Sequence, residues 1–447
     1  MSALDIDKAT QEALAYLQRL VRFDTTNPPG NELPCAKWIA EVFEREGIQA
    51  TVLEPAPGRG SVVARIPGKG GKRPLLLLSH LDVVPAAAED WEHDPFGAEI
   101  VDGEVWGRGT LDTKNLTATW MVLFLSVRRL GLSLDRDLIF AATADEEMGG
   151  TWGVQWLLEN RPELVDCEYV LNEGGGMAFE LGGRTFFTYQ TAEKGICWVK
   201  LTAHGTAGHA SIPHADNPVV HLAEAIRRLG TSRLPVHVCE SFRLFVERLA
   251  AGLPEELGRV VRMVLDEETA ETALAALKDE GQADRLRAMS RNTASPTRLE
   301  ASDKVNVIPQ KAVAEVDCRI LPGQTPEDLL RELREVLGLQ GTPDEKIEIE
   351  FTRTSPPTES PPDTELSRAI ERALARHAPG AGLVPYLVPG GTDSRFFRPR
   401  GVVAYGFSPT LPEADVRTVH GKNERLPIRS LEFSVKVLWD VILDVAR

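Results

Sequence analysis

The sequence predicts an α/β protein that is interrupted by a smaller, inserted α+β module. Three observations lead to this prediction. Up to Tyr189, short apolar segments of strand length alternate with amphipathic helical segments, as in a sheet with helices on both faces. After Tyr189 the order becomes strand, helix, strand, helix, strand, with a charged helical stretch included. From Glu365 onwards the first pattern returns, which favours an insertion over two consecutive domains.

The elements of the first part follow from apolar spacing and from residues that break it. Helices with apolar residues on one face are expected at 11–23, 36–43, 116–130 and 154–158. Short, mainly apolar strands are expected at 61–66, 75–78, 138–143 and 168–171.

The inserted module and the tail are assigned in the same way. In the module, strands are expected at 196–203, 313–320 and 347–352, and helices at 218–229, 326–337 and within 240–290. Ser355-Pro356-Pro357 and Ser360-Pro361-Pro362 indicate a linker, and the tail holds a helix at 365–377, an apolar run at 402–407 and a final helix at 433–445. The predicted boundaries are therefore 1–193 and 357–447 for the larger domain and 194–356 for the module.

Size and composition restrict the class of protein. A chain of 447 residues that is 43% hydrophobic can build large cores, and at roughly 150 residues per domain it holds two or three domains. Lys and Arg number 50 against 66 Asp and Glu, a formal net charge of −16. Because such a chain repels phosphate backbones and anionic lipids, and no basic tract occurs, neither nucleic acid nor a membrane is an expected partner.

The N-terminus and the cysteines indicate a cytoplasmic location. The opening residues carry Asp5 and Asp7 where a secretory signal would be basic and then apolar, and no apolar run approaches the roughly 18 residues of a membrane span. The five cysteines are widely spaced and form no C-x-x-C pair, so we expect buried, reduced thiols.

Polar residues follow three of the predicted strands, where ligands bind in open α/β sheets. The first strand ends in Ser79-His80-Leu81-Asp82. His80 and Asp82 are two positions apart and point the same way in extended chain, so Asp82 can accept a hydrogen bond from one ring nitrogen and leave the other for a metal. The alternative interpretation is a surface histidine beside a solvated aspartate.

The second strand ends in Asp145-Glu146-Glu147 and the third in Asn172-Glu173-Gly174. In extended chain, neighbouring glutamates project in opposite directions, so one can bind a cation while the other faces a water, an arrangement suited to metal-assisted hydrolysis. The alternative for each is an ordinary solvated loop carboxylate. Asp112, shortly before a helix, could instead cap that helix.

Eight motifs in order resemble a family of di-zinc peptidases and amidases that includes aminoacylase, acetylornithine deacetylase, succinyl-diaminopimelate desuccinylase, glutamate carboxypeptidase and carboxypeptidase S. They are S-H-L-D-V-V-P at 79–85, G-R-G-T-L-D-T-K at 107–114, D-E-E at 145–147, N-E-G-G at 172–175, G-H-A-S at 208–211, N-V-I-P at 306–309, G-G-T-D at 390–393 and H-G-K-N-E at 420–424. The resemblance implies a catalytic domain with a central mixed sheet and an inserted ferredoxin-like lid domain.

The resemblance also implies the metal ligands. One metal would be held by His80 and Glu173, a second by Glu147 and His420, and both by Asp112. Glu146 would be the general base, with Asp82 supporting the site. Asp112, Glu146, Glu147 and Glu173 together would carry about four negative charges, which two divalent cations balance. Imidazole and carboxylate ligands suit zinc, with cobalt or manganese as substitutes.

The remaining site residues carry over from the same resemblance. His209 of the lid would stabilise the oxyanion and reach across a homodimer interface formed by the lid. The residues that would hold the substrate are Asn306, Arg319, Gly391 and Thr392. Arg319 is a natural fork for a free carboxylate, and its alternative is a structural ion pair with an acid of the lid.

Departures from the commonest family pattern point to one branch. Asp112 is followed by Thr113-Lys114-Asn115 rather than by Met-Lys-Gly, which resembles the carboxypeptidase S and N-acyl amino acid hydrolase branch. The expected activity is hydrolysis of the amide bond of an N-acyl amino acid or a small peptide with a free carboxylate. The alternatives are an aminopeptidase or dipeptidase that acts at a free amine, and a metal-binding or peptide-binding relative without catalysis.

Overall fold

The computed structural model describes residues 4–277, 280–339 and 346–447, which group into two compact units. Unit 1 comprises Met1–Thr191, Ser360–Tyr386 and Thr392–Arg447, and unit 2 comprises Ala192–Glu359 and Leu387–Gly391. The chain therefore leaves unit 1 after Thr191, returns at Ser360 and leaves it once more for Leu387–Gly391.

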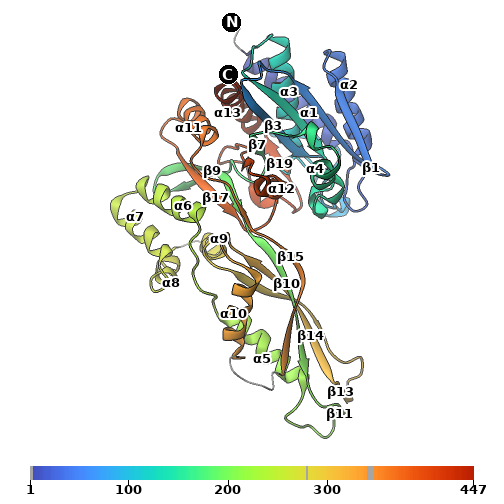
Figure 1. Ribbon diagram of the computed structural model, residues 1–447, viewed down its shortest axis with the longest axis vertical. Coiled ribbons are helices and arrows are strands. Elements are labelled where there is room, and N and C mark those ends of the chain that lie inside the picture. Colours follow the sequence, from blue (N-terminus) through green and yellow to red (C-terminus); the bar gives the residue numbers. More distant parts are fainter. Residues whose placement is uncertain (1–3, 278–279, 340–345) are drawn as a thin grey trace. The chain divides into compact units, whose positions relative to one another are not determined.

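Unit 1 is built on a mixed sheet whose centre is parallel (Figure 1). The parallel strands lie in the order β6 (Arg136–Thr143), β3 (Lys72–His80), β7 (Tyr169–Asn172) and β18 (Val403–Gly406). The strands paired antiparallel around this centre are β1 (Ala50–Ala56), β2 (Arg59–Ile66), β8 (Ala178–Leu181), β9 (Arg184–Glu193) and β16 (Thr358–Glu359). A further strand, β17 (Gly382–Val388), pairs with β9. The predicted fold class, α/β with a central mixed sheet, is confirmed.

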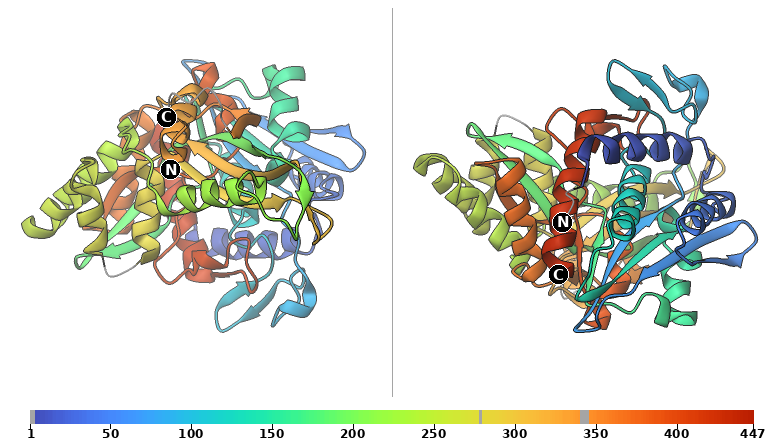
Figure 2. Two further views of the ribbon diagram at one scale, coloured as in Figure 1. Left: turned by 90° about the horizontal axis from the view of Figure 1, so that it is seen from below. Right: turned by 90° about the horizontal axis from the view of Figure 1, so that it is seen from above.

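Helices cover both faces of this sheet because consecutive side chains of β3 point to opposite faces. Leu75 and Leu77 belong to one core, and Leu76 and Leu78 to another. The first core is completed by α1 (Ile6–Val21), α2 (Leu33–Arg45), α3 (Lys114–Arg129), α11 (Glu365–His377) and α13 (Ile428–Ala446). The second is completed by α4 (Trp156–Asn160) and α12 (Ser394–Phe397). Figure 2 shows α13 in dark red alongside α1 in dark blue.

A small three-stranded sheet brings distant segments of unit 1 together. Its strands are β4 (Glu99–Val101), β5 (Glu104–Trp106) and β19 (Arg425–Pro427). Because β19 pairs with β5, the loop that contains His420 is placed beside the segment that leads to Asp112.

Unit 2 contains a four-stranded antiparallel sheet. Its order is β12 (Thr293–Glu300), β14 (Lys311–Ile320), β10 (Gly195–His204) and β15 (Ile347–Ser355). Helices α5 (Pro218–Thr231) and α10 (Pro326–Leu337) share its core, and β11 (Gly208–His209) pairs with β13 (Val307–Ile308) in a short ribbon. The charged stretch forms α6 (Glu240–Ala251), α7 (Glu255–Arg262), α8 (Ala270–Ala275) and α9 (Glu280–Ser290).

The predicted linker is wrong for part of its length. Thr358 pairs with Glu193 in the sheet, and Ser360 is buried with its hydroxyl donating to the Ala404 carbonyl at 3.2 Å. The two proline pairs therefore flank a short strand that is paired in the sheet, and not an unpaired linker. The hydrogen bonds between Ser360 and Ala404 of β18 hold this segment in place.

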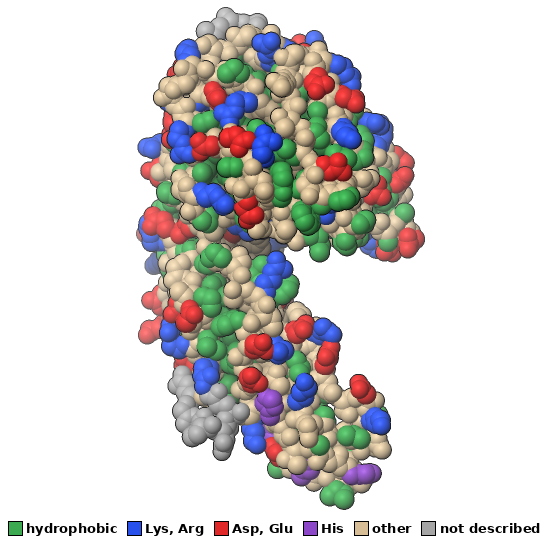
Figure 3. Space-filling view, turned by 45° about the vertical axis from the view of Figure 1, so that its right-hand side comes forward, with side chains coloured by type: hydrophobic (Ala, Val, Ile, Leu, Met, Phe, Trp, Pro, Cys, Tyr) green, Lys and Arg blue, Asp and Glu red, His purple; other side chains and the backbone are tan. Residues whose placement is uncertain are grey.

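Surface and core features agree with the composition. The five cysteines are buried and unpaired among the described residues, which confirms the prediction for these side chains. Acidic and basic side chains are interspersed over the face shown in Figure 3. Within the part of the chain that the structure describes, no helix is long and apolar enough to cross a membrane.

Candidate metal centre

Three parallel strands deliver polar residues to one edge of the unit 1 sheet. β3 ends at His80, β6 is followed by Asp145, Glu146 and Glu147, and β7 is followed by Glu173. Since β3 lies between β6 and β7 and runs parallel to both, these ends meet side by side.

His80 is buried and its two ring nitrogens have different partners. Nδ1 lies 2.9 Å from the backbone oxygen of Asp82, so it carries the proton, and Nε2 faces the site. The Asp82 carboxylate, expected to accept this hydrogen bond, is the more distant partner, with its Oδ1 3.5 Å from Nδ1. That carboxylate instead accepts from the backbone N–H groups of Glu146 and Glu147, both at 3.1 Å.

Asp112 lies between two histidines and turns a different oxygen to each. Its Oδ1 is 3.0 Å from His80 Nε2, and its Oδ2 is 3.1 Å from His420 Nε2. Glu173 Oε1 is 3.7 Å from His80 Nε2, and Glu147 Oε2 is 3.2 Å from His420 Nε2. The five side chains named as ligands thus converge.

These side chains form two overlapping groups, each able to surround one ion. His80, Asp112 and Glu173 offer ligand atoms within 4.8 Å of one another, as do Asp112, Glu147 and His420. Asp112 belongs to both groups.

The side chains of Glu146 and Glu147 were expected to point in opposite directions from extended chain, but the local structure is different. Residues Glu146–Met148 form a single 3-10 turn rather than extended chain. The turn follows Asp145, which has a φ of 71° in the left-handed region. Since Glu147 points to His420 and Glu146 belongs to neither ligand group, the two carboxylates still serve different sides of the site.

Burial and mutual repulsion govern the ionisation of the carboxylates. Burial, reinforced by the charge of Asp112, raises the pKa of Glu173 to about 7. Burial and the charge of Glu173 raise the pKa of Glu146 well above its usual range. Glu147 has a raised pKa as well, chiefly through burial. The negative charge of these carboxylates therefore exceeds what the neighbouring cationic side chains of the protein neutralise.

The histidines respond in the opposite sense. Hydrogen bonds to Asp112 and Glu147 raise the pKa of His420 to about 10. Burial opposes protonation of His80, but Glu173, Asp112 and Asp82 outweigh it and raise its pKa well above the usual range. Asp112 shows the reverse, since its hydrogen bonds to both histidines outweigh burial and lower its pKa. Metal cations bound between these groups would neutralise the carboxylates in the same way as the protonated histidines do.

The residues present fit divalent metal ions. Glu147 Oε1 is buried, and no donor among the described residues reaches it. Two imidazoles and three carboxylates are the mixed nitrogen and oxygen set that zinc, cobalt and manganese accept. An unpaired buried carboxylate oxygen beside such a set is what a metal site requires.

Glu424, which the sequence reasoning quoted in a motif without giving it a role, fixes the Asp112 segment. It is buried and accepts from Arg108 Nη1 at 2.6 Å and from the backbone N–H groups of Gly109, Leu111 and Asp112 at 3.2, 2.6 and 3.1 Å. Because Glu424 follows His420 by four positions, one carboxylate couples two ligand segments.

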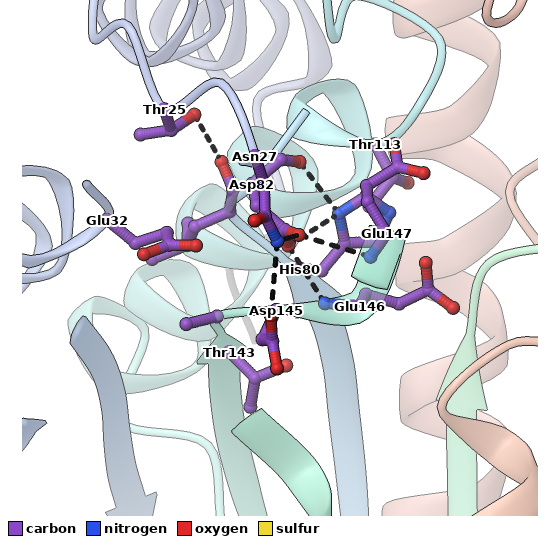
Figure 4. Close-up of polar contacts among 12 residues, drawn as sticks. Thr25, Asn27, Glu32, His80, Asp82, Thr113, Thr143, Asp145, Glu146 and Glu147 are labelled. Atoms are coloured by element: carbon purple, nitrogen blue, oxygen red, sulfur yellow. Dashed lines mark hydrogen bonds and ion pairs between the residues drawn. The ribbon is translucent and has the colours of Figure 1, made fainter. Parts of the chain in front are cut away.

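Asn27 and Arg59 were also missed. Both are buried. Asn27 contacts Asp82 and Asp145 behind the site (Figure 4), and Arg59 contacts Asp145. In the sequence, the segment 27–31 indicates only the end of a helical pattern, and a lone arginine at the start of an apolar strand gives no signal.

Two of the other predicted site residues lie together in unit 2. His209 is exposed on β11 and pairs with Val307 of β13, next to Asn306, whose carbonyl accepts from Ala210 N–H at 3.1 Å. The Ser211 N–H donates to His209 Nδ1 at 3.2 Å, so the neutral ring carries its proton on Nε2.

The remaining predicted substrate residues have different surroundings. Arg319 forms a two-point ion pair with Asp317 at 2.6 and 3.0 Å, as its alternative interpretation expected. Gly391 is exposed in unit 2. Thr392 is buried in unit 1, and its Cγ2 would lie 3.2 Å from a Cβ added to Gly174, the neighbour of Glu173.

Comparison with known proteins gives consistent matches. The model of peptidase family M20/M25/M40 matches residues 76–444. An N-fatty-acyl-amino acid synthase/hydrolase from Danio rerio is 30% identical over 88% of this chain and 77% of its own length. Aminoacylase-1 from Mus musculus is 26% identical over 93% of this chain and 90% of its own length.

Solved structures share the fold. An M20 family metallo-carboxypeptidase from Sulfolobus solfataricus superposes with a TM-score of 0.66 at 22% identity, covering 96% of this chain and 98% of its own. A dinuclear metal-binding M20 peptidase from Bacillus subtilis gives a TM-score of 0.64 at 15% identity, covering 98% of this chain and 99% of its own.

Proposed function

The chain belongs to peptidase family M20/M25/M40, and on that premise we propose that it hydrolyses the amide bond of N-acyl amino acids or small peptides with a free carboxylate. The observation that carries this proposal is the position of Asp112. Its two oxygens face His80 and His420 separately, so each oxygen completes a different three-residue group. Glu146 remains outside both groups.

The residues that would hold the metals are His80 and Glu173 for one ion, Glu147 and His420 for the other, and Asp112 for both. Zinc is the metal we assign, with cobalt or manganese as substitutes. Two such ions, when bound, would supply an acidified water and polarise the scissile carbonyl.

Glu146 is assigned the role of general base. It would accept one proton from the attacking water and deliver it to the nitrogen of the leaving amine as the C–N bond breaks. Asp82 holds the backbone of Glu146 and Glu147 and so fixes where the base stands. The products are a carboxylic acid and a free amino acid or shorter peptide.

His209 is assigned the stabilisation of the negative oxygen that develops on the carbonyl. Its Nδ1 accepts from the Ser211 N–H, which leaves Nε2–H as a donor. We also propose that two copies associate through unit 2, because His209 and Asn306 lie together on its exposed ribbon.

The substrate assignment draws on the relatives and on Arg319. Curated relatives are named for fatty-acyl amino acids and for acylated amino acids, which favours a substrate with a blocked amine. Asp317 forms a two-point ion pair with Arg319, so we propose Asn306, Gly391 and Thr392, ahead of Arg319, as the residues that hold the substrate.

The test is a hydrolysis screen. Chelator-stripped protein is supplied with zinc, cobalt or manganese and offered a panel of N-acyl amino acids, N-blocked dipeptides and dipeptides with a free amine. Release of the amino acid from the blocked compounds, absent in chelator, is the expected result. Cleavage confined to free-amine dipeptides would instead indicate an aminopeptidase or dipeptidase, and no cleavage with metal bound would indicate a binding protein.

A further inference from the structure

Two buried aspartates behind the site share one neutral amide. Asn27 Nδ2 donates to Asp82 Oδ2 at 2.8 Å and to Asp145 Oδ1 at 3.2 Å. All three residues are at most 3% exposed. Figure 4 shows Asn27 between the two carboxylates. An amide nitrogen has two hydrogens, so each can serve one aspartate.

Arg59 supplies positive charge to this cluster and fixes the orientation of the amide. Its Nη2 donates to Asp145 Oδ1 at 3.0 Å, and its Nη1 lies 3.4 Å from Asn27 Oδ1. Because a guanidinium can only donate, the Asn27 oxygen faces Arg59 and its nitrogen faces the aspartates. Glu32 accepts from Nε and Nη2 of Arg59 at 2.9 and 2.6 Å and so holds the guanidinium in place.

The two aspartates hold both ends of the segment that carries Glu146 and Glu147. Asp82 accepts from the N–H groups of these two glutamates, and Asp145 Oδ2 accepts from the Trp152 N–H at 2.9 Å. Asp82 also lies two positions beyond His80. Asn27 therefore joins the β3 end of the site to the β6 end.

We propose that Asn27 and Arg59 are positioning residues for the hydrolysis assigned above, acting through Asp82 and Asp145 on Glu146 and Glu147. The inference rests on the proposed function for its catalytic readout, but its effect on the metal ligand Glu147 is independent of substrate. Without the amide, two buried carboxylates face each other with fewer donors, and the segment between Asp145 and Trp152 shifts to separate them. Displacement of a base by about 1 Å can cost roughly 100-fold in rate.

The variants Asn27→Ala, Asn27→Ser and Arg59→Lys test this inference, with the exposed Asn31→Ala as the matched control. Serine at position 27 keeps one hydrogen-bond donor of the two on the amide. Lysine at position 59 keeps the positive charge but lacks the planar guanidinium that donates to Glu32 and Asp145 together. Each full-length variant is measured for its zinc Kd by competition with a chromophoric chelator, for kcat and KM on an N-acyl amino acid, and for Tm.

We expect Asn27→Ala to raise the zinc Kd by about 10-fold and to lower kcat by about 10-fold to 100-fold with KM within about threefold. Asn27→Ser and Arg59→Lys should show smaller changes of the same kind, and they decide the question if Asn27→Ala does not fold. A variant with a lower Tm but zinc Kd and kcat within twofold of the parent would reduce these residues to a purely structural role and overturn the inference. If the parent chain hydrolyses nothing, the proposed function fails, and the zinc Kd alone tests the positioning.

Discussion

Glu424 and Asp112, 312 positions apart in the chain, are joined by a hydrogen bond of 3.1 Å from the Asp112 backbone N–H to Glu424 Oε1. The same carboxylate also accepts hydrogen bonds from the backbone N–H groups of Gly109 and Leu111, which precede Asp112. Glu424 itself follows the ligand His420 by four residues. The bridging ligand and the last ligand in the sequence are therefore held by one buried side chain.

Glu424→Gln should weaken metal binding without removing a ligand. The glutamine amide would place N–H donors against backbone N–H donors and Arg108, so the Asp112 segment must move. We expect the zinc affinity to fall by about 10-fold to 100-fold, as is typical when a group that orients a metal ligand is changed. Chelator competition measures this, and the exposed Glu89→Gln should match the parent. An unchanged affinity for Glu424→Gln would contradict the coupling.

Glu146→Gln should abolish most hydrolysis while the metals remain bound. The amide cannot accept the proton, but it is the same size and belongs to neither ligand group. A loss of at least about 100-fold in kcat is expected. The measurement combines steady-state kinetics with zinc analysis, and Glu159→Gln on the exposed side of α4 is the control. Full activity in Glu146→Gln would rule out the base role.

His209→Ala should lower kcat more than it raises KM, because an oxyanion donor acts mainly in the transition state. The loss of one such donor costs about 100-fold to 1,000-fold. Ser211→Ala removes the hydroxyl 2.7 Å from His209 Nδ1 but keeps the backbone donor, so its effect should be smaller. His214→Ala, an exposed histidine nearby, is the control. An equal loss in His209→Ala and His214→Ala would show that neither histidine acts specifically.

Removal of metal should destabilise the protein as well as inactivate it. The crowded carboxylates repel one another, and an ion that binds only the folded state at 100 times its Kd adds about 2.7 kcal/mol. The Tm should therefore fall after chelation and recover with zinc. In Asp112→Asn, which loses the negative charge shared by both groups, the zinc-dependent rise in Tm should shrink markedly. If zinc raised the Tm of both proteins equally, it would be binding elsewhere.

Lys194 should make stability depend on pH in unit 2. Burial lowers its pKa to about 7, against about 10.4 in the unfolded chain. The unfolded state therefore binds more protons between these values, and the free energy of unfolding should rise by about 1.4 kcal/mol per pH unit from pH 7 towards 10. Urea unfolding of the parent and of Lys194→Met gives the difference. A difference independent of pH would contradict the lowered pKa.

Local pattern predicted the strand ends well. β3 contains four consecutive leucines and ends in a histidine, and the apolar runs of β6 and β7 are followed by acids, so both the sheet and its polar edge are visible in short stretches of sequence. The fold class follows from the same alternation. The strand β9 was missed because it carries buried polar residues, such as Gln190 and Thr191, that interrupt an apolar strand pattern.

Roles that depend on distant contacts could not be predicted. Asn27 reaches Asp145, 118 positions away, and Glu424 reaches Gly109, 315 positions away. An asparagine beside two prolines and a glutamate in a polar loop are ordinary surface residues until the fold buries them. The turn at Glu146 was misjudged for a related reason: the side chain of Asp145, which has a left-handed backbone conformation, accepts from Asn27, Arg59 and the Trp152 N–H, and only the tertiary structure brings these donors together.

The return of the chain to unit 1 has an evolutionary and practical consequence. The N–H of Ser360 donates to the carbonyl of Thr191 at 2.8 Å, so the two cut ends of the host domain almost touch. The segment Ala192–Glu359, which is unit 2 apart from Leu387–Gly391, can therefore be exchanged by splicing one short peptide across this gap, while every ligand of the metal groups stays in unit 1. Relatives with enlarged, reduced or replaced modules could thus diversify their substrates while inheriting one unaltered hydrolytic centre.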